Sequence, residues 1–170
     1  MNKEKPSDII VLFHSLLIAY QIALRDLLGS GRAIFFCPVL ENFTKINEMV
    51  GLETHKGQDP DAALQTFTKT IEDAGFIRNF SFEKLGELEY ILHIDGCIWA
   101  PKIHKKFNTK DLACPFALMA MSIVQACSGK KIKCTDSEYL EEGTRTKIEV
   151  LKSTDVQDNF KKRLTLGEEV

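Results

Sequence analysis

Hydrophobic and polar positions change their period about halfway along the chain. Residues 9–28 (IIVLFHSLLIAYQIALRDLL) are almost all apolar, residues 34–49 follow an approximate helical repeat, and residues 63–74 keep their apolar side chains on one helical face. Beyond Gly75, apolar and polar residues alternate, as they do in a strand with one buried face. The pattern predicts a helical first half followed by strands.

Start and stop signals support these helices. The first helix is expected over about residues 7–28, because the glycines of residues 29–31 tolerate the positive φ of a helix end. Another helix is expected to begin at Asp59-Pro60, where the carboxylate accepts free amide hydrogens and the proline has the φ of a first helical residue. Gly75 ends that helix.

The second half predicts strands around one more helix. Residues 76–82 and 88–94 alternate and form a hairpin, and the apolar run ACPFALMAMSIVQACSGK predicts a buried helix that Gly129 closes. Two further strands, around residues 132–134 and 148–150, are joined by the turn EEGTR. Hairpin-linked strands favour an α+β fold, with an antiparallel sheet of about four strands and helices packed on one side.

The first helix combines a broad apolar surface with a narrow polar stripe. His14, Gln21 and Arg25 lie along one helical line, and Arg25 and Asp26 make a membrane span a poor interpretation. We expect a helix that is buried on most sides, either at the centre of the domain or between two subunits. The second possibility predicts a homodimer, and no membrane-spanning segment is expected.

Composition limits the class of protein. A chain of 170 residues, 44% of them hydrophobic, matches one domain over residues 1–170. The 22 basic and 24 acidic residues are mixed along the chain, which argues against a nucleic-acid-binding face. Five cysteines without the spacing of a disulfide framework favour a reducing cytoplasm.

One window gathers residues that bind metals. The stretch HIDGCIWAPKIHKKFNTKDLAC contains His93, Cys97, His104 and Cys114. Cys114 precedes Pro115 at the head of the apolar helix, where the helix dipole favours the thiolate that binds metal. Zinc accepts two thiolates and two imidazoles in a tetrahedron, so the window predicts a zinc site.

Simpler readings of the same window stay open. Cysteines are among the most often buried residues, so Cys97 and Cys114 also fit an ordinary core. A nucleophilic pair of Cys114 and His104 would need an orienting third group, which the sequence does not identify. No catalytic residue is predicted, and a closed zinc site with four protein ligands would be structural.

The order of features after this window resembles a known family. Cys114 heads an apolar helix that ends at Gly129, and a strand with Cys134, an acidic stretch, a turn at Gly143 and a last strand follow. This arrangement resembles the 4-vinyl reductase domain. The resemblance covers residues 59–151, with residues 1–58 as a helical N-terminal part and residues 152–170 as a C-terminal tail.

The resemblance carries expectations of fold and ligands. It implies the α+β fold shared by Golgi-tethering (TRAPP) subunits and haem nitric oxide sensors. It also implies binding of a small, often hydrocarbon-like molecule, as in members of the 4-vinyl reductase domain family. It implies zinc held by Cys114, with Cys97 and His104 as upstream ligands. A cysteine often found in the last strand is replaced near Thr146, which leaves the fourth ligand open between His93, Cys127 and water.

The sequence therefore predicts a cytoplasmic, homodimeric, zinc-containing protein that binds a small apolar ligand in a sensing or carrier role. A zinc-dependent or reductase-type enzyme is the first alternative. A lipid-holding scaffold of the trafficking type is the second.

Overall fold

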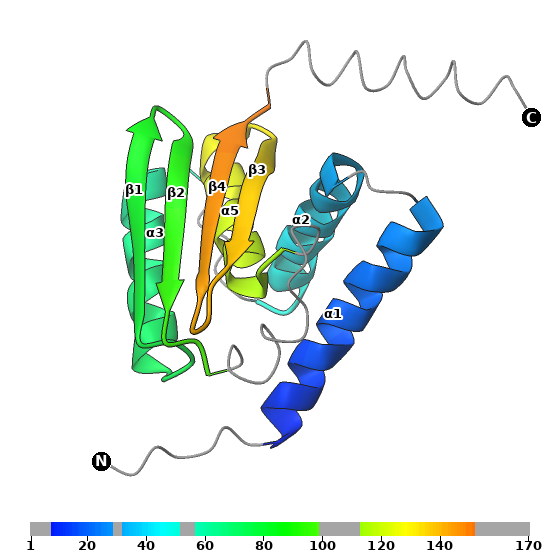
Figure 1. Ribbon diagram of the computed structural model, residues 1–170. Helices are drawn as coiled ribbons and strands as arrows, with labels where there is room; N and C mark the ends of the chain where they lie inside the picture. Colours follow the sequence, from blue (N-terminus) through cyan, green and yellow to red (C-terminus); the bar gives the residue numbers. More distant parts are fainter. Residues whose placement is uncertain (1–7, 29–31, 52–56, 99–112, 152–170) are drawn as a thin grey trace, which may run out of the picture.

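The computed structural model describes residues 8–28, 32–51, 57–98 and 113–151 (Figure 1). The predicted tail, residues 152–170, lies outside the described residues. Helices and strands follow the predicted order, a helical half and then strands around one more helix. The elements are α1 (Asp8–Leu28), α2 (Arg32–Met49), α3 (Pro60–Asp73), β1 (Asn79–Gly86), β2 (Glu89–Asp95), α5 (Pro115–Ser128), β3 (Ile132–Tyr139) and β4 (Thr144–Val150).

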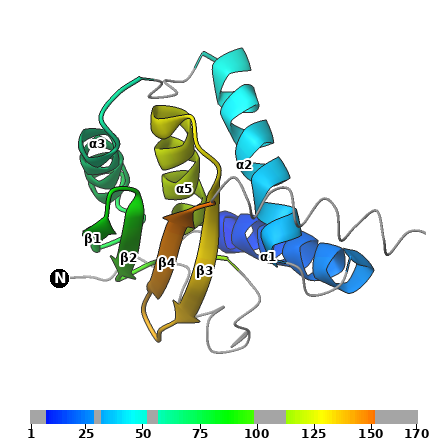
Figure 2. The ribbon, with the colours of Figure 1, turned by 90° about the horizontal axis from the view of Figure 1, so that it is seen from above.

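Two hairpins form one antiparallel sheet in the order β1-β2-β4-β3. The hairpins meet where β2 pairs with β4, which aligns Tyr90 with Ile148 and Leu92 with Thr146. Helices α2, α3 and α5 lie on one side of this sheet (Figure 2). The predicted α+β class, with about four strands and helices on one side, is confirmed.

The core lies between α5 and the inner face of the sheet. Helix α5 buries Phe116, Ala117, Ala120, Met121 and Val124. They meet the alternate residues of the strands that point the same way, among them Tyr90, Leu92, Ile94, Ile132 and Ile148. Because strand side chains alternate between faces, the intervening residues form an open face rich in charge. There Lys133 pairs with Glu149 at 2.9 Å and Lys147 with Glu89 at 2.7 Å.

Helix α3 begins where the sequence predicted and is tied to the first hairpin. The Asp59 carboxylate accepts from the Ala62 amide at 3.0 Å. Two residues further, Asp61 accepts from the Lys84 ammonium at 2.7 Å and from the Tyr90 hydroxyl at 2.7 Å. Hydrogen bonds from Lys84 and then from Tyr90 lower the pKa of Asp61. Burial, followed by the hydrogen bond to Asp61, raises the pKa of Tyr90.

Replacing Asp61 with asparagine is expected to lower the free energy of unfolding by about 1 kcal/mol at pH 7. Because folding lowers the pKa of Asp61, its contribution is full above the unfolded pKa near ~3.9 and is lost as the pH falls through the folded pKa. Urea unfolding at pH 7 and pH 3 should therefore show a smaller effect at pH 3. Glu83→Gln, on the open sheet face, is the matched control. An equal loss at both pH values would contradict this assignment.

Helix α1 departs from its prediction. It stands apart from the sheet, beyond α2 and the β3 edge (Figures 1 and 2). In α1, Ile18 is buried, but many of the other large apolar side chains of the helix are exposed. The expectation that α1 is buried at the centre of the domain is therefore wrong for the single chain, since tertiary contacts cover only one side of it. Among the helices of the described residues, none is both long and apolar enough to span a bilayer.

Candidate functional site

The end of β2, the start of β4 and the head of α5 meet at one corner of the sheet. Ile94 pairs with Thr144, and the Cys97 amide donates to the Glu142 carbonyl at 2.9 Å. The Cys114 thiol lies beside the Thr144 hydroxyl. Cys97 and Cys114 are 4% and 3% exposed and belong to the same buried cluster. The fold thus brings two of the four predicted zinc ligands to one corner.

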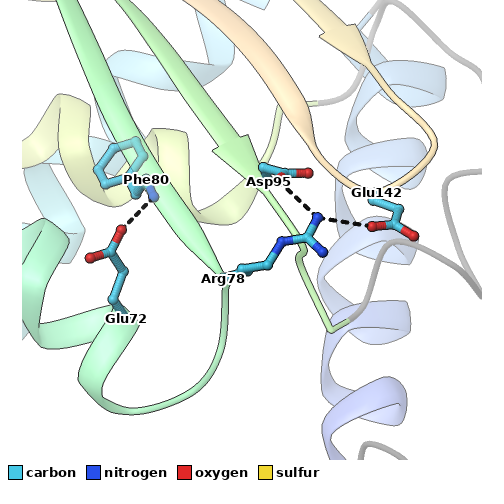
Figure 3. Close-up of polar contacts among 5 residues, drawn as sticks. All are labelled: Glu72, Arg78, Phe80, Asp95 and Glu142. Atoms are coloured by element: carbon cyan, nitrogen blue, oxygen red, sulfur yellow. Dashed lines mark hydrogen bonds and ion pairs between the residues drawn. The ribbon is translucent and has the colours of Figure 1, made fainter. Parts of the chain in front are cut away.

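Arg78 bridges two acidic side chains on the outside of this corner (Figure 3). Its guanidinium donates to Asp95 at 2.8 Å and to Glu142 at 3.1 Å, so it links the end of β2 to the β3–β4 turn. The hydrogen bond to Asp95 is the main reason that the pKa of Arg78 is raised. All three side chains are about half exposed or more, so water screens their attraction. Arg78 therefore orients the corner more than it stabilises it.

Two opposing effects act on the Cys114 thiol, which is buried at the head of α5. Burial raises its pKa. The Thr144 hydroxyl and the backbone amides of Ala117 and Phe116 offset only part of this rise. The amides at the helix head therefore favour the thiolate, as predicted, but desolvation outweighs them. A bound cation would reverse this balance, since coordination deprotonates a thiol.

The other proposed ligands lie elsewhere. His93 sits between the core residues Leu92 and Ile94, and it pairs with Ser81 and Arg145 in the neighbouring strands. Its side chain is therefore on the open face of the sheet, as the alternation predicted, and Cys114 is on the core side. Cys127 is near the other end of α5, about 20 Å from Cys114 at 1.5 Å per residue.

His104 lies outside the described residues. Within the part of the chain that the structure describes, no group of three or more His, Cys, Asp or Glu side chains is placed to hold a metal ion. Cys97 and Cys114 are the two predicted ligands that the described residues bring to one corner. The zinc site with all its ligands therefore stays a prediction.

Helix α1 presents a second candidate site, and its orientation is the opposite of that of a helix that turns its apolar side toward the core. Gln21, from the predicted polar stripe, faces the body of the protein. Its side-chain amide donates to the Ala113 carbonyl at 3.1 Å, and its carbonyl accepts from the Ala113 amide at 2.9 Å. Ile18, about one turn earlier, is 1% exposed on the same side. This inward side leaves the broad apolar arc facing outward.

Six large side chains form this outward arc, which we call the α1 face. Their exposed fractions run from 44% for Leu17 to 79% for Leu27. The α1 face consists of Leu12, Phe13, Leu16, Leu17, Tyr20 and Leu27. Sequence reasoning left this surface either at the centre of the domain or between two subunits, and it did not name the surface as a site. The signal that could have found it was the width of the apolar arc opposite a polar stripe of only three residues.

An open depression of about 320 Å³ lies at the far end of the sheet from the cysteine corner. Glu87 and Lys130 flank it, with their charged atoms 3.8 Å apart. Glu89 and Glu149 also line it, and each is paired with a lysine of the open face. Leu88 and Val150 also line it, so the lining is mixed and does not single out a small apolar ligand.

No family model matches the chain, and no curated protein sequence matches it. One solved structure is similar, a trafficking protein particle complex subunit 3 from Naegleria fowleri covalently bound to palmitic acid. The two chains share 10% identity with a TM-score of 0.43, over 86% of this chain and 95% of that one. The resemblance to the 4-vinyl reductase domain stays a prediction.

Proposed function

We propose that this protein is an interaction protein of the scaffold type, and that the α1 face is its working surface. One observation carries the proposal. Gln21 of the polar stripe is turned inward onto Ala113, and six large apolar side chains are turned outward. A helix that served only to complete the core would have the opposite orientation.

The size of the α1 face supports association. Its exposed fractions add up to between three and four fully exposed large side chains. At roughly 200 Å² for each such side chain, the face covers about 700 Å², beyond the ~300–600 Å² patches of typical monomers. Removing that area from water is worth on the order of 15 kcal/mol before the costs of association. Patches of this size mark interaction sites, and a homodimer is one way to cover this one.

A photoreactive side chain tests this function. In cells that express the full chain, p-benzoyl-phenylalanine at position Leu16 is expected to give a discrete covalent adduct with a protein on irradiation. The same group at Glu83, on the open sheet face, is the matched control and should give none. Adding Tyr20→Glu should abolish the Leu16 adduct, because a carboxylate within the face opposes burial. Equal labelling at both positions would contradict an interaction role for α1.

The cysteine corner supports a second candidate, the zinc-containing, ligand-binding role. Cys97 and Cys114 are both buried at one corner, and the Phe116 and Ala117 amides face the Cys114 sulfur. We propose that these two thiolates hold zinc with His104 as the third ligand. Because His93 is on the opposite sheet face and Cys127 is at the far end of α5, we favour water as the fourth ligand.

Metal analysis of the purified full chain tests this candidate. About one zinc per chain is expected, and it should be lost in Cys97→Ser, Cys114→Ser and His104→Ala. Cys134→Ser is the matched control, since Cys134 is also buried but lies on β3, where its thiol donates to the Asp136 carbonyl at 3.4 Å. Zinc retained in Cys114→Ser, or no zinc in the unaltered chain, would overturn the proposal.

The role of the metal would follow from its open position. With three protein ligands and water, zinc can activate that water, which keeps the zinc-dependent enzyme among the alternatives. A small apolar ligand bound by a carrier or sensor remains the other use of the same corner. The lipid-holding scaffold predicts a chain whose intact mass exceeds the sequence mass by one fatty acyl group. Intact-mass spectrometry of the native protein separates that alternative from the first two.

A further inference from the structure

We infer that the partner of the α1 face is a second copy of this chain, bound as an antiparallel pair of α1 helices related by a two-fold axis between Leu16 and Tyr20. This inference rests on the proposed function and names the partner for the same surface. It is carried by the area, the chemistry and the placement of the α1 face.

The area of the α1 face fits a standard dimer. A stable interface buries about 800 Å² on each partner. The α1 face offers about 700 Å² of exposed large side chains, and the small residues between them add to this area. Helix α1 can therefore supply nearly a complete interface by itself. A pair of α1 helices would then need few contacts from the rest of the chain.

The chemistry of the face suits contact with its own copy. A two-fold interface brings the same surface of both subunits together, so a charge near the axis would meet its like charge. Residues 9–24 contain no Asp, Glu, Lys or Arg. The Tyr20 hydroxyl can both donate and accept a hydrogen bond, so it also tolerates a symmetric partner. An uncharged face of this kind is self-complementary.

The shape of the face permits close approach. Leu12, Leu16 and Tyr20 form a ridge at four-residue spacing, and the exposed small residues Ser15, Ala19 and Ala23 form a parallel groove. At the two-fold axis, Leu16 and Tyr20 of this ridge meet Tyr20 and Leu16 of the copy, and the groove of small residues beside the ridge lets the two helices approach closely. The antiparallel direction is favoured because the helix dipoles then oppose each other. Helix α1 also stands apart from the sheet, beyond the β3 edge (Figure 2).

Sedimentation equilibrium of the purified full chain, between about 1 and 50 μM, tests the inference. The unaltered chain is expected to have twice its mass of 19.2 kDa. Leu16→Glu and Tyr20→Lys should each weaken association at least ~100-fold, because each buries two unpaired charges in the pair. Glu83→Lys, on the open sheet face, should leave the dimer unchanged. Thermal melts should show that the α1 variants stay folded, since both side chains are exposed.

Mixing the two variants tests the pairing itself. In the antiparallel pair, Leu16 of one chain faces Tyr20 of the other. A mixture of Leu16→Glu and Tyr20→Lys chains should therefore recover association, with one ion pair and one native contact. Failure of the mixture to associate would overturn the antiparallel pairing. This recovery also excludes misfolding as the reason that each variant is monomeric.

The remaining outcomes separate this inference from the proposed function. A monomeric unaltered chain, or a dimer that neither α1 variant weakens, overturns the second copy as partner. If the Leu16 photoadduct then contains a different protein, the interaction role stands without the homodimer. Binding of the monomeric unaltered chain to phosphatidylcholine–phosphatidylserine vesicles, lost in Leu16→Glu, would assign the face to a lipid surface and overturn both proposals.

Discussion

Replacing Gly143 with alanine is expected to lower the free energy of unfolding by about 3 kcal/mol. A Cβ atom on Gly143 would overlap the carbonyl oxygen of Ile94, and it would lie 2.7 Å from the carbonyl carbon of the same residue. Both atoms belong to the backbone of β2, which is held between β1 and β4 and cannot shift without breaking pairs. Urea unfolding would measure the loss as a lower midpoint concentration at an unchanged m-value.

Gly75→Ala is the matched control for this experiment. Gly75 has a φ of 73°, but a Cβ atom there would meet no atom of a more distant residue within 4 Å. Alanine at this position costs only the strain of a left-handed backbone, about 1 kcal/mol. If Gly143→Ala unfolds at the same urea concentration as Gly75→Ala, the close approach of the β3–β4 turn to β2 is not present in solution. The difference between the two variants isolates the steric cost at the cysteine corner.

Replacing Thr146 with valine is expected to lower the free energy of unfolding by about 1–3 kcal/mol. The Thr146 hydroxyl is 3.2 Å from the Ser137 hydroxyl, and both residues are buried. Valine keeps the shape of threonine but leaves the Ser137 hydroxyl without its partner inside the core. Chemical denaturation at pH 7 measures the change.

A double-mutant cycle tests whether the two hydroxyls act as a pair. Ser137→Ala removes the second hydroxyl, so the double variant no longer buries an unpaired polar group. Its loss of stability should be smaller than the sum of the two single losses, by about 1 kcal/mol. Strictly additive losses would show that the two hydroxyls are satisfied independently.

Local patterns predicted the elements well because each pattern has a local cause. The third predicted helix begins at Asp59-Pro60 because the Asp59 side chain caps the Ala62 amide, a contact only three residues long. The strands were found from alternation, which also placed His93 on the face opposite Tyr90 and Leu92. These predictions needed no knowledge of distant contacts, and each is confirmed.

The candidate site was only partly predictable. Cys97 and Cys114 were selected because they share a short window with two histidines, and the fold does bring both to one corner. The same proximity in sequence did not place His93 there, because one residue of strand register turns a side chain to the opposite face. The burial that raises the pKa of Cys114 was not predicted either, since desolvation depends on every element that covers the thiol.

By itself, the sequence determined the helices, the strands, the hairpins and the α+β class, because hydrophobic period, capping and turn residues act over a few positions. Only the tertiary structure decided that β2 pairs with β4, that Gly143 crosses the backbone of Ile94 and that α1 turns its apolar face outward. An apolar arc is equally apolar whether it faces the core or a partner. Among the described residues, the distant contacts that set its direction include the hydrogen bonds of Gln21 with Ala113 and the burial of Ile18.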